Sequence, residues 1–212
     1  MKNILLTLTA IAGVTFVSNA QEITGFQKGN FIVEGSLTYN HADNENTQIK
    51  TSAFGFSPKV GAFLSERVAL GVDLSIGSTS RENYSGSNTV KLNTNSFGFG
   101  AFGRYYFLEL GNRFKTYTEL GVGYNSSIVK TITGGNTTDS PSVNGIGVNA
   151  GLGANYFLTD KLAINFAFAN LIGYNSKRVD WNGDKATNNF DVNINNFNNF
   201  FNAAQFGLTF KL

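Results

Sequence analysis

Residues 68–77 read VALGVDLSIG, and this stretch decides the fold. Apolar side chains occupy every second position from Val68 to Ile76, while Asp73 takes one of the positions between them. Successive side chains of a β-strand point to opposite faces, so the alternation predicts a strand with one apolar and one polar face. Other alternating stretches also keep their charged residues on the polar face; these residues are Glu34, Lys59, Arg104, Lys115, Glu119 and Lys211.

The bulk of the two faces indicates which one meets the interior of the fold. The face without charge carries the large side chains, whereas the charged face is rich in glycine. A secreted soluble barrel that binds a ligand would turn its bulky apolar face inward, and this alternative stays open here. A membrane barrel has the opposite arrangement, with apolar residues toward lipid and polar residues toward the lumen. We therefore expect the apolar face to contact a membrane.

Eight such stretches predict an all-β fold, an eight-stranded antiparallel up-and-down transmembrane β-barrel. The strands are expected near residues 30–40, 51–64, 68–77, 95–108, 114–125, 143–157, 162–173 and 200–212. Short connections alternate with long ones, and the long ones are expected at 41–50, 78–94, 126–142 and 174–199. Outer-membrane barrels have this asymmetry, with short periplasmic turns and long extracellular loops. Residues 186–199 fit either a strand extension or a loop.

The amino-terminal segment has the features of a signal peptide. Lys2 precedes an apolar run at residues 4–17, and small residues follow this run up to Ala20. The pattern predicts a cleaved signal peptide at 1–20 and a barrel domain at 21–212.

The composition excludes several classes of protein. The chain has no cysteine, which excludes a thiolate metal site and a lipid anchor on cysteine. The 16 Lys and Arg residues nearly balance the 14 Asp and Glu residues, so nothing indicates nucleic-acid binding. We expect no cofactor, no metal site and no enzymatic activity. A lipid-modifying enzyme is an alternative, and it would depend on His41, the single histidine, with Asp43 and Glu45 nearby.

The short turns allow the antiparallel register to be counted. A hairpin centred on Glu66 places Lys59 opposite Asp73. The hairpin that follows the fourth strand places Arg104 opposite Glu119. Opposite charges then face each other across neighbouring strands inside the barrel.

The inward charges have two interpretations. The five residues concerned are Glu34, Lys59, Asp73, Arg104 and Glu119. Eight strands enclose a space that side chains just fill, which favours a closed polar plug built from the two register pairs with Glu34 nearby. The alternative is a narrow porin-like channel for ions or small solutes.

The last long connection carries candidate contact residues. Trp181 and Phe190 are large apolar side chains among many Asn residues. A strand in this segment would offer an unpaired edge to a partner. We therefore predict that Trp181 and Phe190 contact an extracellular surface partner.

The carboxy-terminal strand resembles an assembly signal. Residues 206–212 read FGLTFKL, which is similar to the carboxy-terminal signal of outer-membrane barrels, although those usually end in an aromatic residue and this chain ends in Leu212. The resemblance implies that the barrel-assembly machinery recognises the last strand.

Three further segments carry a wider resemblance, namely SPKVG at 57–61, FGRYY at 102–106 and ELGVGY at 119–124. They resemble the small outer-membrane β-barrel family often described as porin-like, with the architecture of the OmpA transmembrane domain and of OmpX. This resemblance implies a location in the outer membrane and contact with its lipid and lipopolysaccharide. It also implies a non-enzymatic role of the extracellular loops in envelope integrity or in surface interaction such as adhesion.

Overall fold

The computed structural model describes residues 25–85, 88–181, 183–193 and 205–212. The signal peptide expected at 1–20 lies outside these residues. The described strands are β1 (Phe31–Asn44), β2 (Ile49–Phe63), β3 (Val68–Ser85), β4 (Asn88–Leu110), β5 (Phe114–Thr133), β6 (Asn136–Asp139), β7 (Val143–Phe157), β8 (Leu162–Val179), β9 (Thr187–Val192) and β10 (Gln205–Lys211). Among the described residues, no helix is long and apolar enough to cross a membrane.

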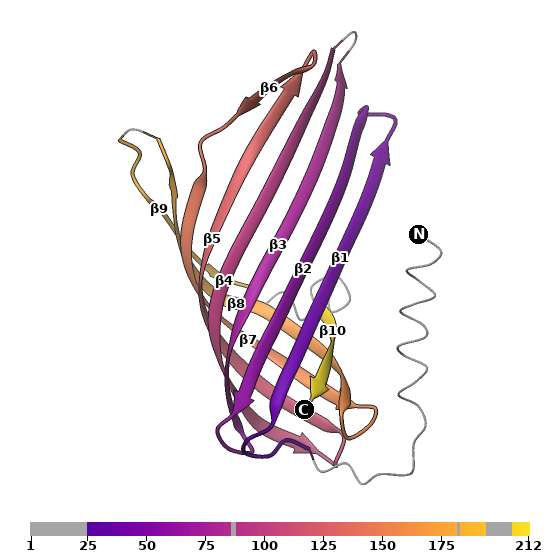
Figure 1. The fold of residues 1–212 in the computed structure, drawn as a ribbon, viewed down its shortest axis with the longest axis vertical. Coiled ribbons are helices and arrows are strands. Elements are labelled where there is room, and N and C mark those ends of the chain that lie inside the picture. The colour runs from indigo at the N-terminus through magenta and orange to yellow at the C-terminus, as the bar shows by residue number, and fades with distance from the viewer. Residues whose placement is uncertain (1–24, 86–87, 182, 194–204) are drawn as a thin grey trace.

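Eight of these strands close into an antiparallel barrel, which confirms the predicted fold class (Figure 1). The sheet runs from β10 through β1, β2, β3, β4, β5 and β7 to β8, and β10 closes it by pairing with β8 as well as with β1. β6 and β9 lie outside this ring, because β6 pairs with β5 and β9 pairs with β8. The start of β1 at Phe31 and the residue Leu212 lie together at the end of the barrel that carries the short turns, called the short-turn end below.

The counted register is confirmed at both hairpins. Lys59 pairs with Asp73 across β2 and β3. Arg104 pairs with Glu119 across β4 and β5. The first short turn sets its register directly, whereas the second hairpin reaches the counted register through a bulge between Tyr106 and Leu108. The bulge lets the apolar faces of the two strands coincide.

Two short turns have the same hydrogen bonds, as the similar sequences at 63–70 and 157–164 suggest. In the first, the Leu64 amide donates to the Val68 carbonyl at 2.9 Å. In the second, the Leu158 amide donates to the Leu162 carbonyl at 2.8 Å. In each turn one side-chain hydroxyl accepts hydrogen bonds from two backbone amides. The hydroxyl belongs to Ser65 in the first turn and to the matching Thr159 in the second.

At the end of the barrel opposite the short turns, the strands continue beyond the alternating stretches as paired β-ribbons. The prediction of long loops in these segments is therefore wrong. β3 and β4 stay paired from Val68 and Tyr105 to Ser85 and Asn88. The described parts of 41–50, 126–142 and 174–199 likewise contain paired strands, and β9 shows that residues 187–192 extend the sheet. Backbone hydrogen bonds continue along two strands whatever faces they present. The apolar alternation therefore marks where lipid contact stops, and the strands extend beyond that level.

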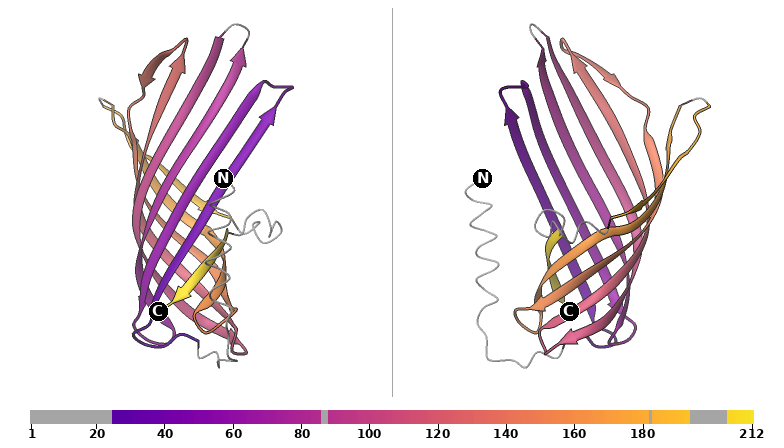
Figure 2. Two further views of the ribbon diagram at one scale, coloured as in Figure 1. Left: turned by 45° about the vertical axis from the view of Figure 1, so that its right-hand side comes forward. Right: turned by 180° about the vertical axis from the view of Figure 1, so that it is seen from behind.

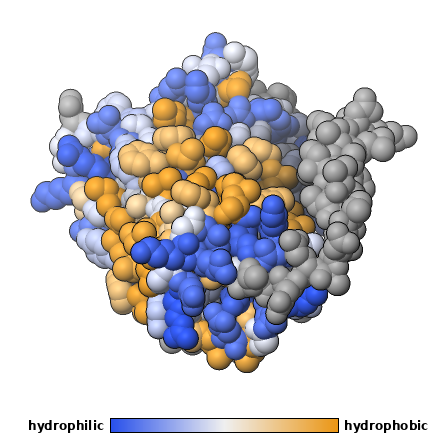
Figure 3. Space-filling model, turned by 60° about the horizontal axis from the view of Figure 1, so that its bottom comes forward, coloured by the Kyte–Doolittle hydropathy of each residue, from blue (hydrophilic) through white to orange (hydrophobic). Residues whose placement is uncertain are grey.

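The apolar face points outward along the barrel wall. Large side chains that alternate along β3, among them Leu70, Val72, Leu74 and Ile76, are all exposed. Apolar side chains gather over the wall in Figure 3, while polar side chains gather at the short-turn end and on the ribbons. This arrangement is the one expected of a barrel surrounded by lipid.

The upper part of β8 bends away from the barrel axis. β7 and β8 pair in register up to Leu152 and Phe168, and pairing resumes at Ala150 and Ile172. The extra residues of β8 form a bulge, which bends a strand. Beyond the bulge, β8 and β9 lean away from the wall formed by β1–β5 (Figures 1 and 2).

Candidate functional site

A bidentate ion pair lies at the centre of the lumen. Arg104 donates from Nη1 and Nη2 to the two carboxylate oxygens of Glu34, at 2.7 and 2.8 Å. Its Nε donates to Glu119 at 3.0 Å, and its guanidinium lies 3.9 Å from the ring centroid of Tyr117. The Arg104 side chain is only 1% exposed. A guanidinium matches carboxylates in this forked geometry, so the three charged groups hold one another in fixed positions.

The hydrogen bonds around this ion pair form a closed ring. Arg104 donates to the hydroxyl of Tyr106 at 3.2 Å, and that hydroxyl donates to Asn155 Oδ1 at 2.9 Å. Asn155 donates to the Thr209 hydroxyl at 2.8 Å, which in turn donates to Glu34 Oε1 at 2.7 Å. The ring joins β4, β7, β10 and β1, so it ties the last strand to the first across the seam of the barrel.

Lys59 departs from the predicted pairing. Its Nζ lies 2.5 Å from Glu119 Oε1, and the ion pairs of the described residues do not join it to Asp73. The long Lys59 side chain passes over the ring of Phe102, 5.1 Å from the centroid, to reach Glu119 from across the lumen. The short Asp73 side chain lies over Gly100 on the next strand instead, where an added Cβ would come within 2.8 Å of its carboxylate. Register therefore aligned the backbones correctly but did not decide which side chains meet.

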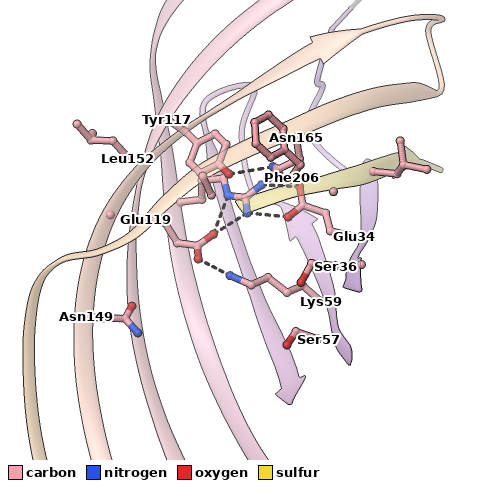
Figure 4. A pocket seen from close by; sticks show the side chains of 16 residues that line it. Glu34, Ser36, Ser57, Lys59, Tyr117, Glu119, Asn149, Leu152, Asn165 and Phe206 are labelled. Atoms are coloured by element: carbon pink, nitrogen blue, oxygen red, sulfur yellow. Dashed lines mark hydrogen bonds and ion pairs between the residues drawn. The ribbon is translucent and has the colours of Figure 1, made fainter. Parts of the chain in front are cut away.

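These residues form the lumen network, defined as Glu34, Lys59, Tyr106, Arg104, Tyr117, Glu119, Asn155, Asn165 and Thr209. Figure 4 shows Glu34, Lys59, Tyr117 and Glu119 pointing toward one another from β1, β2 and β5. A small, partly open cavity of about 60 Å³ borders the network, and its lining includes Ser36, Ser57 and Asn149, which lie farther from the short turns.

An aromatic cluster closes the lumen below the network. Phe26, from the segment that precedes β1, is 4% exposed inside the short-turn end. Its ring stacks on Phe63 with 4.3 Å between centroids, and it lies 4.9 Å from Tyr106 and 5.0 Å from Phe157. Buried aromatic rings in these geometries contribute about 0.5–1.5 kcal/mol per pair beyond their burial.

Lys211 holds the segment that carries Phe26, and Lys115 packs against it. Lys211 Nζ donates to the Gly25 carbonyl at 2.8 Å and forms an ion pair with Asp160 at 2.8 Å. Lys115 lies so close to Gly25 that a Cβ there would meet its side chain at 2.5 Å. Gly25 also has φ +71°, a conformation that glycine adopts without strain.

The sequence did not single out several of these residues. Phe26 precedes the first alternating stretch, so periodicity gives no signal for it. Tyr106 and Thr209 share the inward face with Arg104 and Lys211 on their own strands, and this parity is the signal that finds them. Tyr117 shares the inward face with Lys115 and Glu119 on β5, and its hydroxyl accepts a hydrogen bond from Asn165 at 2.9 Å.

The other candidate residues lie outside the lumen. The His41 ring contacts the Ser52 hydroxyl at 2.9 Å on the outward face, and the hydrogen bonds of the described residues give that ring no carboxylate partner. A hydrolytic triad requires such a third group, so this pair gives the enzyme alternative no support. Trp181 and Phe190 are 64% and 68% exposed. Within the described ranges, no three acidic or histidine side chains group as metal ligands would.

Comparison with solved structures found matches of low sequence identity. Two of the matched structures are the outer membrane protein OprG from Pseudomonas aeruginosa and Ail, the attachment invasion locus protein of Yersinia pestis. OprG is 15% identical, with 90% of this chain and 99% of that chain covered and a TM-score of 0.49. Ail is 14% identical, with 88% of this chain and 100% of that chain covered and a TM-score of 0.46. A search of curated protein sequences found no match.

A family model gives the assignment that these distant structures do not. The model describes an outer membrane protein beta-barrel domain, and it matches residues 6–210. The match spans every described strand of the barrel, including the closing strand β10 almost to its end. This chain belongs to the outer membrane protein β-barrel domain family.

Proposed function

We propose that this outer-membrane barrel is a non-enzymatic surface protein that acts through its extracellular ribbons, in surface interaction such as adhesion or in envelope integrity. The observation that carries the proposal is the filled lumen. Arg104 and its partners occupy the middle of the barrel, and the rings around Phe26 occupy the periplasmic end. A lumen filled in two layers supports a function outside it, and the ribbons are the part of the chain that extends farthest into the surroundings.

The proposal includes three partners. Outer-membrane lipid and lipopolysaccharide surround the exposed apolar wall. The barrel-assembly machinery recognises the closing strand β10, whose apolar residues alternate up to Leu212. An extracellular surface partner contacts the ribbons.

A truncated ribbon tests the proposal. Ser78 and Asn95 are register partners on β3 and β4, so residues 79–94 can be replaced by a two-residue Asn-Gly turn without changing the pairing below. The control variant carries the same Asn-Gly turn at the tip of the full-length ribbon. Cells that carry the truncated barrel should lose adhesion or become sensitive to detergents and large antibiotics, whereas the control should behave as the unmodified protein.

The outcome that would contradict the proposal is equally specific. If the truncated barrel folds, as shown by its heat-dependent mobility on gels, and leaves both adhesion and the envelope barrier unchanged, this ribbon has no such role. Matching truncations of the β1–β2, β5–β6 and β8–β9 ribbons would then decide whether any ribbon has one.

A further inference from the structure

The β8–β9 ribbon, made of β9 and the part of β8 above its bulge, carries an apolar patch on one face. Register places Tyr174 beside Phe190 and Ile172 beside Val192. On the neighbouring strand, Val148 is the partner of Tyr174. The exposed fraction of each of these side chains lies between 42% and 68%. The apolar patch is defined as Ile146, Val148, Ile172, Tyr174, Phe190 and Val192.

The apolar patch continues the lipid-facing wall of the barrel. Val148 is the register partner of Val122 on β5, and Val122 is the partner of Ala101 on β4. β9 also obeys the rule of the barrel strands, because Asp191, its one charge, lies on the face opposite Phe190 and Val192. An apolar row without charge therefore extends from the barrel wall onto a strand that is not part of the barrel.

The bend in β8 decides where this face points. An outward face that stays parallel to the barrel axis points sideways. When a ribbon leans away from the axis, as β8 and β9 do in Figure 2, its outward face turns toward the membrane surface below it. The apolar patch thus faces the outer leaflet.

The ribbons on the other side of the barrel that contain β2 and β3 have a different outward face. Above the wall, β2 and β3 carry Ser52, Ser78 and Ser80 and then Lys50 and Glu82. Their ion pairs continue the row, since Lys50 contacts Asp43 at 3.5 Å and Glu82 contacts Lys91 at 2.7 Å. Hydroxyls and alternating charges are suited to water and sugar, so the apolar patch has no counterpart on the upper parts of β2 and β3.

The order of side chains along β8 matches a membrane interface. On its outward face, Ile172 is followed by Tyr174, then by Ser176 and then by Arg178. An apolar residue suits acyl chains, a tyrosine suits the interface, and a cation with a long stem reaches phosphate. From the bulge upward, these side chains therefore follow the order of environments from the acyl chains of a bilayer to its headgroups.

We infer that the β8–β9 ribbon lies on the outer leaflet and binds lipid through the apolar patch, with Tyr174 and Phe190 at the level where acyl chains meet headgroups. The inference deepens the proposed contact of Phe190 by naming its partner as a lipid surface, and it rests on the outer-membrane location. The barrel would then present a ninth strand to lipid, on one side only.

Tryptophan fluorescence tests this inference, because Trp181 is the one tryptophan of the chain. In a Trp181→Phe background, Phe190→Trp places a reporter on the apolar patch, and Asn189→Trp places one on the opposite face of the same strand. Tyr174→Trp is a second reporter on the patch, should the first variant fold poorly. Phe99→Trp, at an exposed position of the barrel wall, provides the reference for full lipid contact.

Each variant is reconstituted in phosphatidylcholine vesicles whose acyl chains carry bromine, and folding is checked by heat-dependent gel mobility. The reporters of Phe190→Trp and Tyr174→Trp should lose emission to brominated lipid to an extent comparable with Phe99→Trp, and should resist aqueous iodide. The Asn189→Trp reporter should show the reverse.

Quenching of the Phe190→Trp and Tyr174→Trp reporters by iodide and not by brominated lipid would overturn the inference, since the patch would then face water. Equal lipid quenching of the Asn189→Trp reporter would also overturn it, because the whole ribbon would be immersed without a preferred face. The measurement reports lipid contact alone, so its failure is distinguishable from a failure of the ribbon truncation described above.

Discussion

Arg104 is the residue on which the interior of this barrel depends. Its guanidinium contacts Glu34 and Glu119, and its side chain is almost fully buried. A buried ion pair need not stabilise a fold relative to apolar residues, but removal of one partner leaves the other as an uncompensated charge. The number of contacts that Arg104 makes therefore predicts a large effect of its removal.

Arg104→Ala should lower the free energy of unfolding by about 3–5 kcal/mol, because it leaves Glu34 buried without a counter-charge. Urea titration of the vesicle-embedded barrel, followed by gel mobility, measures the change. Arg81→Ala is the control, since Arg81 is exposed and its removal should change stability by less than about 0.5 kcal/mol. Equal stability of the two variants would contradict the role of Arg104.

A double-mutant cycle separates the Arg104–Glu119 contact from the rest of the network. Arg104→Ala, Glu119→Ala and the double variant should show a coupling energy of about 0.5–3 kcal/mol, as residues in contact do. Additive losses of unfolding free energy would mean that the two side chains do not interact.

Glu82 gives a prediction outside the membrane. Hydrogen bonds from Lys91 and then from Tyr84, at 2.7 and 2.8 Å, lower the pKa of its carboxyl group below the ordinary value of 4.5. Because the pKa is lowered in the folded ribbon, the contribution of Glu82 is present above that ordinary value and is lost as pH falls through the lowered one. Carbon NMR titration of the side chain should show a midpoint that rises toward 4.5 in Lys91→Ala. An unchanged midpoint would contradict the contact.

At the scale of the element, β7 shows how the narrow lumen limits the size of the side chains on its inward face. Gly145, Gly147, Gly151 and Gly153 recur with period two, which indicates an interior face that requires small residues. The structure gives the reason at one of these positions. A Cβ on Gly153 would lie 2.3 Å from the ring of Tyr117, whereas a Cβ on Gly147 would make only ordinary contacts of 3.6 Å or more.

Gly153→Ala should therefore destabilise the barrel by about 1–3 kcal/mol, because Tyr117 must move from its place beside Arg104. Gly147→Ala is a matched control on the same strand and face, and it should be nearly neutral. The same urea titration measures both variants. A neutral Gly153→Ala would mean that Tyr117 relaxes without cost.

The sequence predicted which face of each strand is apolar, but it predicted strands that are too short. Each of the eight predicted alternating stretches corresponds to a barrel strand, because the period of two is a property of each strand alone. The ribbons were missed because Ser, Thr and Asn at 78–94 carry no apolar signal, although the backbone there is fully able to pair.

At the scale of the whole molecule, the filled lumen predicts a silent barrel. Purified mature protein, refolded in detergent and inserted into a planar bilayer, should show no stable conductance steps, because the lumen network and the ring of Phe26 occupy the cross-section. Heat-dependent gel mobility must first show that the sample is folded. Reproducible steps of one size would make transport the leading function and the inward charges part of a conduit.

The sequence by itself determined which face of each strand meets lipid and how strands joined by short turns align. Both depend on residues within about a dozen positions of one another, as Lys59 and Asp73 are, so a local pattern contains the information. Only the tertiary structure decided which inward side chains meet. Thr209 and Glu34 are 175 positions apart, and Lys59 reaches Glu119 rather than its register partner. The first contact depends on closure of the sheet, which makes β10 a neighbour of β1. The second depends on the narrow lumen, across which side chains of β2 and β5 come within reach of each other.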